Sequence, residues 1–206
     1  MQFTISLPEW AVQEHAKLPT HFPNLEDRMR IVIRFSQLNI DQNTGGPFAA
    51  GVFERDSGRM IVIGVNRVVP SNVSSAHAEI VALALAQQKL SSWDLGSNRF
   101  PAMQLVVNWR PCAMCYGATI WSGIESLVIA ASDDACERIT GFDEGPIHPN
   151  WQSELSKRGI SLQDGLLRDE AIQVFESFRA RGHLVYNASR FAPWHAASPD
   201  NSQPDA

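Results

Sequence analysis

Two short motifs constrain the fold of this chain more than any other part of its sequence. His77 and Glu79 form an H-x-E pattern at the start of the apolar run "AHAEIVALALAQ", and Cys112 and Cys115 begin a second run, "CAMCYGATIWSG". Both runs have helical spacing, and the segment between them contains one strand, "AMQLVVNW". The two helices can therefore lie side by side on one face of a sheet, with their N-termini at the same end.

The other segments predict the rest of that sheet and its helices. Residues 8–40 are expected to be helical in two pieces, separated by the prolines of "LPTHFPN". The segment "TGGPFAAGVFERDSGRMIVIGVNRVV" predicts a β-hairpin that turns at Asp56-Ser57-Gly58, and "PSNVSS" predicts a polar loop. A strand, a helix and a strand around the cysteines predict parallel pairing through a right-handed crossover. After the loop "TGFDEGPIHPN" we expect a helix, a fifth strand and a terminal helix.

These elements predict a three-layer α-β-α domain of the α/β class with a mixed five-stranded sheet. The chain has 206 residues, which fits one domain with appendages. We expect an N-terminal extension at 1–24, the main domain at 25–191 and a tail at 192–206. The tail is rich in Pro, Ser, Asn and Asp, a composition typical of disorder.

Composition narrows the class of protein. A formal net charge of -5 is a weak argument against a nucleic-acid partner, because such proteins usually carry a basic surface. No apolar run reaches the roughly 18 residues of a membrane-spanning helix, so we expect no membrane partner. The N-terminus lacks the basic start and apolar centre of a signal peptide, which favours a cytoplasmic protein. In that reducing compartment, a C-x-x-C spacing indicates metal or redox chemistry.

The two motifs together predict a zinc site. His77 offers one imidazole, and Cys112 and Cys115 offer two thiolates, which makes three ligands for a tetrahedral ion with the fourth position open. An open position is typical of catalytic zinc, where a water molecule binds. Glu79 is too close to His77 to bind the same ion comfortably. It can instead point at that water and act as a general acid and base.

Each part of the pattern also has an ordinary interpretation. His77 alone is more often a helix-start or core histidine, and Glu79 alone is a first-turn carboxylate facing the helix dipole. A thioredoxin-like redox role for the cysteines is disfavoured, because it would give the H-x-E pattern no function. A closed structural site would need a fourth ligand, and Cys136 could supply it only if its helix folded back. H-x-E followed by P-C-x-x-C is the pattern of zinc deaminases.

From about Glu26 to Arg190 the sequence resembles the cytidine deaminase superfamily. It is most similar there to the small bacterial zinc-dependent guanine deaminases. The stretches that carry the resemblance are "GGPFAA", "NRVV", "AHAEI", "PCAMCYGATIW" and "GFDEGP". The last is the most specific, because it looks like a loop of the guanine deaminase branch. The resemblance implies zinc-dependent deamination of a free amino-purine, guanine to xanthine and ammonia. It also implies a homodimer with exchanged C-terminal segments.

The resemblance further implies roles for individual residues around the base. Glu144, in "GFDEGP", would help position the base and move protons. The substrate-binding residues that it implies are Asn66 at the base edge, Phe48 stacked on the purine, the Ala78 backbone, Trp121 in an aromatic wall, Asp143, and Tyr186 closing the pocket. Taken without the resemblance, Phe48 and Trp121 are equally plausible core residues, and Asn66 may be read simply as the end of a strand.

One residue departs from the pattern of the relatives. Arg110 precedes Pro111, where relatives often carry an acidic residue. We interpret Arg110 as a solvated side chain, with a role in selecting the ring as the alternative. Other amino-heterocycles therefore stay open as substrates: cytosine or cytidine, guanosine, or a triazine such as ammeline. A tRNA adenosine deaminase and a non-enzymatic zinc scaffold are the remaining alternatives.

Overall fold

A mixed five-stranded sheet forms the centre of the computed structural model, which describes residues 4–188. Its strand order is β2-β1-β3-β4-β5. β1 pairs antiparallel with both β2 and β3, whereas β3, β4 and β5 run parallel. The strands span Ala49–Glu54 (β1), Met60–Val65 (β2), Met103–Val107 (β3), Ser126–Ile129 (β4) and Ser161–Gln163 (β5). The predicted mixed sheet, with its hairpin and its parallel crossover, is confirmed.

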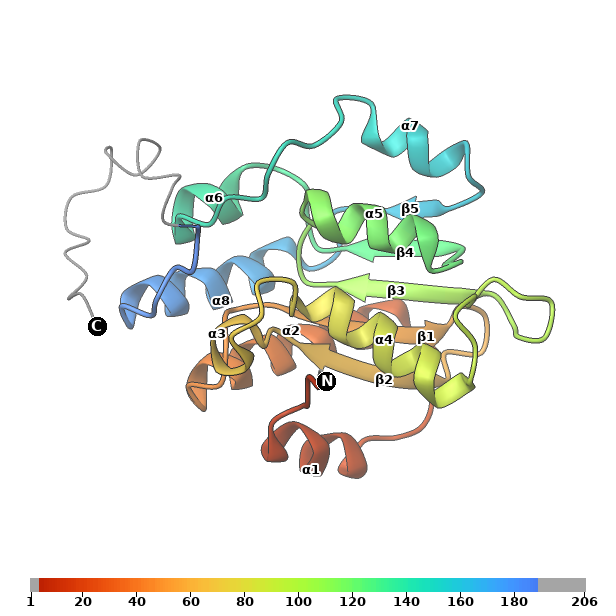
Figure 1. Cartoon of the computed structure of the whole chain (residues 1–206), viewed down its shortest axis with the longest axis horizontal. Helices are drawn as coiled ribbons and strands as arrows, with labels where there is room; N and C mark the ends of the chain where they lie inside the picture. The colour runs from red at the N-terminus through yellow and green to blue at the C-terminus, as the bar shows by residue number, and fades with distance from the viewer. Residues whose placement is uncertain (1–3, 189–206) are drawn as a thin grey trace.

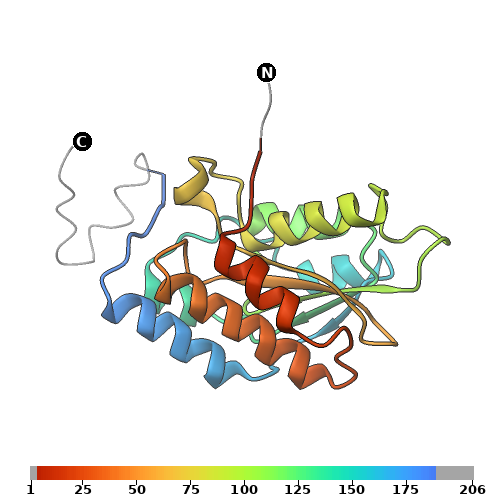
Figure 2. The ribbon, with the colours of Figure 1, turned by 90° about the horizontal axis from the view of Figure 1, so that it is seen from below.

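Helices cover both faces of the sheet (Figures 1 and 2). α4 (Ala78–Leu90) and α5 (Ala113–Trp121) lie on one face, and α2 (Leu25–Asp41) and α8 (Arg168–Ala180) lie on the other. Every residue of the first four strands is buried, as expected for strands covered on both sides. The three-layer prediction is therefore confirmed, and each layer of helices has its own apolar core against the sheet.

Four further helices complete the described chain. They are α1 (Glu9–Lys17), α3 (Val68–Ser71), α6 (Ala135–Thr140) and α7 (Trp151–Ser156). α3 spans the end of the segment predicted as the hairpin and the first two residues of the predicted loop. Its proline stands within the first turn, where a missing N–H is tolerated, and Asn72 ends it in the left-handed region at φ 51°.

The N-terminal segment packs against the main domain. Ala11 of α1 is fully buried, and the Trp10 indole N–H donates to the Thr44 hydroxyl at 2.8 Å. The predicted tail at 192–206 lies outside the described residues. Within residues 4–188, no helix combines the length and the apolar character needed to cross a membrane.

Candidate metal centre and active site

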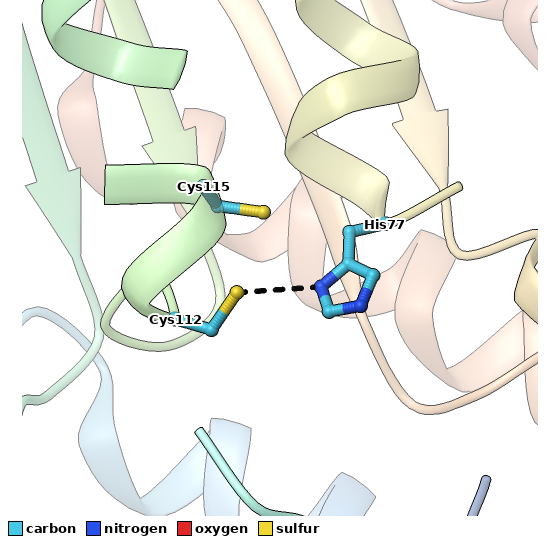
Figure 3. A group of neighbouring side chains, drawn as sticks. All are labelled: His77, Cys112 and Cys115. Atoms are coloured by element: carbon cyan, nitrogen blue, oxygen red, sulfur yellow. Dashed lines mark hydrogen bonds between the residues drawn. The ribbon is translucent and has the colours of Figure 1, made fainter. Parts of the chain in front are cut away.

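The starts of α4 and α5 bring His77, Cys112 and Cys115 together, as the sequence predicts. His77 is the residue before α4, and Cys112 is the residue before α5. Figure 3 shows the three side chains pointing toward one another from the two helices, with 3.5 Å between His77 Nδ1 and Cys112 Sγ. Their ligand atoms all lie within 4.8 Å of one another. Neither the His77 nor the Cys112 side chain makes a capping hydrogen bond to its own helix, so both can face the cluster.

The electrostatics of the cluster suit a cation. A hydrogen bond from Cys115, together with the neighbouring His77, lowers the pKa of Cys112 to about 4, so Cys112 is a thiolate at neutral pH. The Cys112 thiolate and burial raise the pKa of Cys115 well above its usual value. Burial opposes protonation of His77, but Cys112 and Glu79 leave its pKa raised. The cluster therefore combines a Cys112 thiolate and the carboxyl group of Glu79 with an imidazole, a donor set that can bind a cation.

The donor set fits zinc. Tetrahedral zinc binds sulfur at about 2.3 Å and imidazole nitrogen at about 2.0 Å, so its ligand atoms stand roughly 3.5 Å apart. The three atoms approach that spacing already. Cys136 lies in α6 and is not part of the cluster, so residues 4–188 offer three such ligands and no fourth cysteine or histidine. This arrangement leaves one position open.

Glu79 lies in the first turn of α4, beside the metal cluster. It is 6% exposed, and burial followed by the charge of Cys112 raises its pKa to about 7. Its carboxylate also interacts with the Cys115 thiol. A carboxyl group that gains and loses a proton near neutral pH is suited to general acid-base work.

One pocket opens onto this cluster, and seven of the residues predicted for the site line it: Phe48, Asn66, His77, Glu79, Asp143, Glu144 and Tyr186. Asn66 follows β2, and its side-chain oxygen accepts from the backbone N–H groups of Gly46 (3.4 Å) and Val68 (3.3 Å). Its Nδ2 is buried and has no acceptor among the described residues. The amide is thus held in place through its oxygen, and its NH₂ group is left without an acceptor among the described residues.

Aromatic side chains form one side of the pocket. Phe48 contacts Phe142 at 5.3 Å between ring centroids, and Phe142 contacts Tyr186 at 4.6 Å. The prediction for Trp121 is wrong: its side chain is 81% exposed at the end of α5 and does not line the pocket. Trp109, which follows β3 and is 2% exposed, lines the pocket instead.

The loop "GFDEGP" reaches the pocket and is tied to the metal-binding helix. The Glu144 carbonyl accepts from the backbone N–H of Ala113, the first residue of α5, at 3.0 Å. Burial, followed by the charges of Cys112 and Glu79, raises the pKa of Glu144 to about 8. Two carboxyl groups that hold protons near neutral pH therefore share one pocket.

Arg110 is not a solvated side chain, and that interpretation is wrong. Its side chain is 16% exposed and lines the same pocket. Its Nη2 lies 3.9 Å from Glu137 Oε2, and its Nε is buried without a partner among the described residues. Trp109, the preceding residue, is buried and lines the same pocket, so both residues contribute to the pocket wall.

Several lining residues were not predicted from the sequence, and Ala78, like Trp121, is a predicted residue that lies elsewhere. Ala78 is fully buried in the first turn of α4 and does not line the pocket. The lining residues that were missed are Val107, Trp109, Phe142, Asn187 and Ala188. Phe142 lies inside the "GFDEGP" loop, next to the predicted residues Asp143 and Glu144. That position was the sequence signal that could have identified it. Asn187 donates to the Gly141 carbonyl and accepts from the Asp143 N–H, contacts that no sequence spacing indicates.

Comparison with known proteins places the chain among deaminases. The structure is similar to the solved guanine deaminase from Nitrosomonas europaea, with a TM-score of 0.82, 49% identity, and coverage of 87% of this chain and 97% of that one. It is also similar to the protein NE0047 in complex with 2,6-diaminopurine, with a TM-score of 0.83, 49% identity, and coverage of 89% and 96%.

Curated relatives include two kinds of deaminase. The guanine deaminase of Bacillus subtilis is 29% identical over 157 residues, which cover 76% of this chain and 94% of that protein. The tRNA-specific adenosine deaminase of Buchnera aphidicola is 27% identical over 150 residues, or 73% and 90%. The sequence model of the cytidine and deoxycytidylate deaminase zinc-binding region matches residues 23–131. Since that match spans more than half of the chain and contains His77, Glu79 and both cysteines, the chain belongs to the cytidine and deoxycytidylate deaminase family.

Proposed function

We propose that this protein is a zinc-dependent hydrolase that converts guanine and water to xanthine and ammonia. The observation that carries the proposal is the buried Glu79 beside the His77, Cys112 and Cys115 cluster, at the base of a pocket that also contains Glu144. The likeness to guanine deaminases at 49% identity supports guanine as the substrate.

His77, Cys112 and Cys115 would hold the metal ion. Zinc bound there would supply Lewis acidity, which lowers the pKa of water and stabilises negative charge on the attacking oxygen. Glu79 accepts the proton of the attacking water and passes it to a ring nitrogen next to C2. Glu144, which burial keeps protonated at neutral pH, would donate a proton to the departing amine and regain one from the hydroxyl group on C2, which becomes the carbonyl of xanthine.

The pocket walls hold the ring for this chemistry. Phe48 would stack on the purine face, and the free Nδ2 of Asn66 would donate to an acceptor at the edge of the base. Asp143 and Tyr186, in the loop and in the C-terminal segment, would border the pocket entrance. Closing a site in this way excludes water and strengthens the electrostatic interactions inside it.

The substrate is tested with zinc-loaded protein and a release assay for ammonia. Guanine, guanosine, cytidine, adenine and ammeline are compared at equal concentration, and we expect turnover to be highest with guanine. Turnover of another base, with none of guanine, would refute the substrate assignment. A Glu79→Gln protein should keep its zinc and lose roughly 10²- to 10⁴-fold in kcat; unchanged turnover would refute its role as base.

The oligomeric state and the cellular location are separate parts of the proposal. We propose a cytoplasmic homodimer; the exchange of C-terminal segments that the resemblance implies has no support from residues 4–188, where Tyr186 and Asn187 contact the chain's own pocket. The exposed Trp121 (81%) and Met114 (39%) on α5 support an apolar contact between copies. Light scattering of the full chain measures the mass in solution, and a monomeric mass would contradict this part of the proposal.

A tRNA adenosine deaminase is the second candidate, because a relative with that activity covers 73% of this chain. The formal net charge of -5 disfavours it. Measuring tRNA binding over a range of salt concentrations separates the two functions. Tight, salt-dependent binding together with inosine formation would favour the tRNA enzyme.

A further inference from the structure

Two donor groups in the pocket lack an acceptor. Four buried side-chain nitrogen or oxygen atoms in residues 4–188 have no hydrogen-bond partner, and two of them, Asn66 Nδ2 and Arg110 Nε, belong to residues that line this pocket. A buried donor left unpaired costs roughly 1–3 kcal/mol. A ligand with two acceptors at this pocket would satisfy both groups.

The order of the strands places these donors on either side of Phe48. β1 lies between β2 and β3 and runs antiparallel to both. Phe48 precedes β1, Asn66 follows β2, and Arg110 lies three residues beyond the end of β3. All three residues are therefore at one end of the sheet, with Phe48 in the middle. A flat ring stacked on Phe48 would meet a donor at each of two edges.

Arg110 keeps donor capacity beyond its contact with Glu137, because its buried Nε has no hydrogen-bond partner among the described residues. Its one ion pair among the described residues, with Glu137, is 3.9 Å long, beyond the range of a hydrogen bond. The planar guanidinium of arginine has five N–H donors, no acceptor and a permanent charge. It therefore favours a carbonyl oxygen on the ligand and disfavours an amino group in the same place.

We propose that Arg110 determines specificity by donating a hydrogen bond to the exocyclic oxygen of the purine. The assignment rests on the proposed function, since guanine carries an oxygen at C6 and an amino group at the reacting C2. Adenine and 2,6-diaminopurine have an amino group at C6, and 2-aminopurine has only hydrogen there. The cation would prefer guanine over all three. A site built to hydrogen-bond a substrate group discriminates strongly against analogues that lack it.

The test compares guanine with 2-aminopurine in binding, so that it does not depend on turnover. Dissociation constants are measured by calorimetry on zinc-loaded Glu79→Gln protein, with and without Arg110→Met. We expect the Glu79→Gln protein to prefer guanine, and Arg110→Met to reduce that preference about 10- to 100-fold, mainly through weaker guanine binding. Arg110→Lys, which keeps the charge but loses Nε, should reduce it at least several-fold.

A matched variant separates direct recognition from an indirect effect. Glu137→Gln removes the partner of Arg110 but leaves the guanidinium at the pocket, so the preference for guanine should stay within about twofold. If Glu137→Gln abolishes the preference as Arg110→Met does, Arg110 acts through α6 and the proposal is overturned. Equal weakening of both bases by Arg110→Met, or no initial preference, overturns it as well.

The outcome is distinguishable from failure of the proposed function. That function fails if wild-type protein releases no ammonia from guanine, whereas the Arg110 assignment is decided by the ratio of dissociation constants. Binding of neither base would overturn the assignment. Zinc content and the melting temperature of each variant confirm that the pocket is intact, and Arg110→Lys decides the question if Arg110→Met does not fold.

Discussion

At the scale of single residues, the pocket is defined by carboxyl groups that keep their protons near neutral pH. Glu79 and Glu144 both lie in a region of low dielectric constant beside the Cys112 thiolate. Burial and that negative charge raise their pKa values to about 7 and about 8. Groups with such values exchange protons efficiently at neutral pH, which is the requirement for a hydrolysis that moves two protons.

Glu144→Gln tests the second of these groups. The amide keeps the size of the side chain but cannot deliver a proton, so we expect kcat with guanine to fall at least about 100-fold while zinc content stays unchanged. Steady-state kinetics and metal analysis measure both. Glu176→Gln, an exposed site on α8, serves as the control and should leave kcat within about twofold. A kcat for Glu144→Gln equal to that of the control would show that Glu144 moves no proton.

At the scale of secondary structure elements, the two helix starts are the part of the site that sequence predicts best. His77 and Cys112 stand directly before α4 and α5, where the motif spacing places them. One strand between the helices is enough to bring their N-termini to one edge, because a right-handed crossover leaves few other arrangements. The three candidate metal ligands and Glu79 follow from local spacing in the chain, and so the sequence predicts them.

The pocket walls are harder to predict because they depend on packing. Helical spacing alone does not say that Trp121 points to solvent at the end of α5, or that Trp109 is buried beside the pocket. Arginine is usually a surface residue. Only the position of α6 and Glu137 in the structure shows that the Arg110 side chain is enclosed. The contacts of Asn187 with the loop join positions more than forty residues apart, which no local pattern records.

The β1–β2 hairpin contains a test of stability that is independent of the site. Hydrogen bonds from Arg59 lower the pKa of Glu54 below its usual value, although burial opposes the shift. Arg59 Nε donates to Glu54 Oε1 at 2.7 Å, and Glu54 is 7% exposed. Because the Arg59 side chain is 41% exposed, solvent screens the pair, and Glu54→Gln should cost only about 1 kcal/mol at pH 7.

The sign of the pH dependence follows from the lowered pKa. The Glu54 contribution is complete above the unfolded-state pKa of about 4.3 and is lost as the pH falls through the lower folded-state value. The difference in unfolding free energy between wild type and Glu54→Gln should therefore be constant from pH 5 to 8 and shrink below about pH 4. Urea denaturation at each pH measures it. A difference that grows toward acid pH would contradict the assignment.

At the scale of the whole molecule, the site joins two layers of the fold at one end of the sheet. The metal ligands come from the α4 and α5 layer, whereas Phe142 packs against Phe178 of α8 in the opposite layer. The loop that carries Glu144 passes between these layers and is tied to α5 through the Ala113 N–H. A metal ion bound at the starts of α4 and α5 would therefore affect the stability of the domain as well as the proposed catalysis.

Removal of zinc should lower the melting temperature. A ligand that binds only the folded state stabilises it by about 4 kcal/mol at a thousandfold excess over its dissociation constant. For a chain of this size each kcal/mol shifts the melting temperature by about 2–4 °C, so a chelator should lower it by about 8–16 °C. Scanning calorimetry before and after chelation measures the shift. Glu79→Gln should show the same shift, whereas Cys112→Ser, which loses one of the three ligands, should show a much smaller one. If chelation leaves the melting temperature of the wild type unchanged, the cluster at the starts of α4 and α5 does not hold a metal ion that links them.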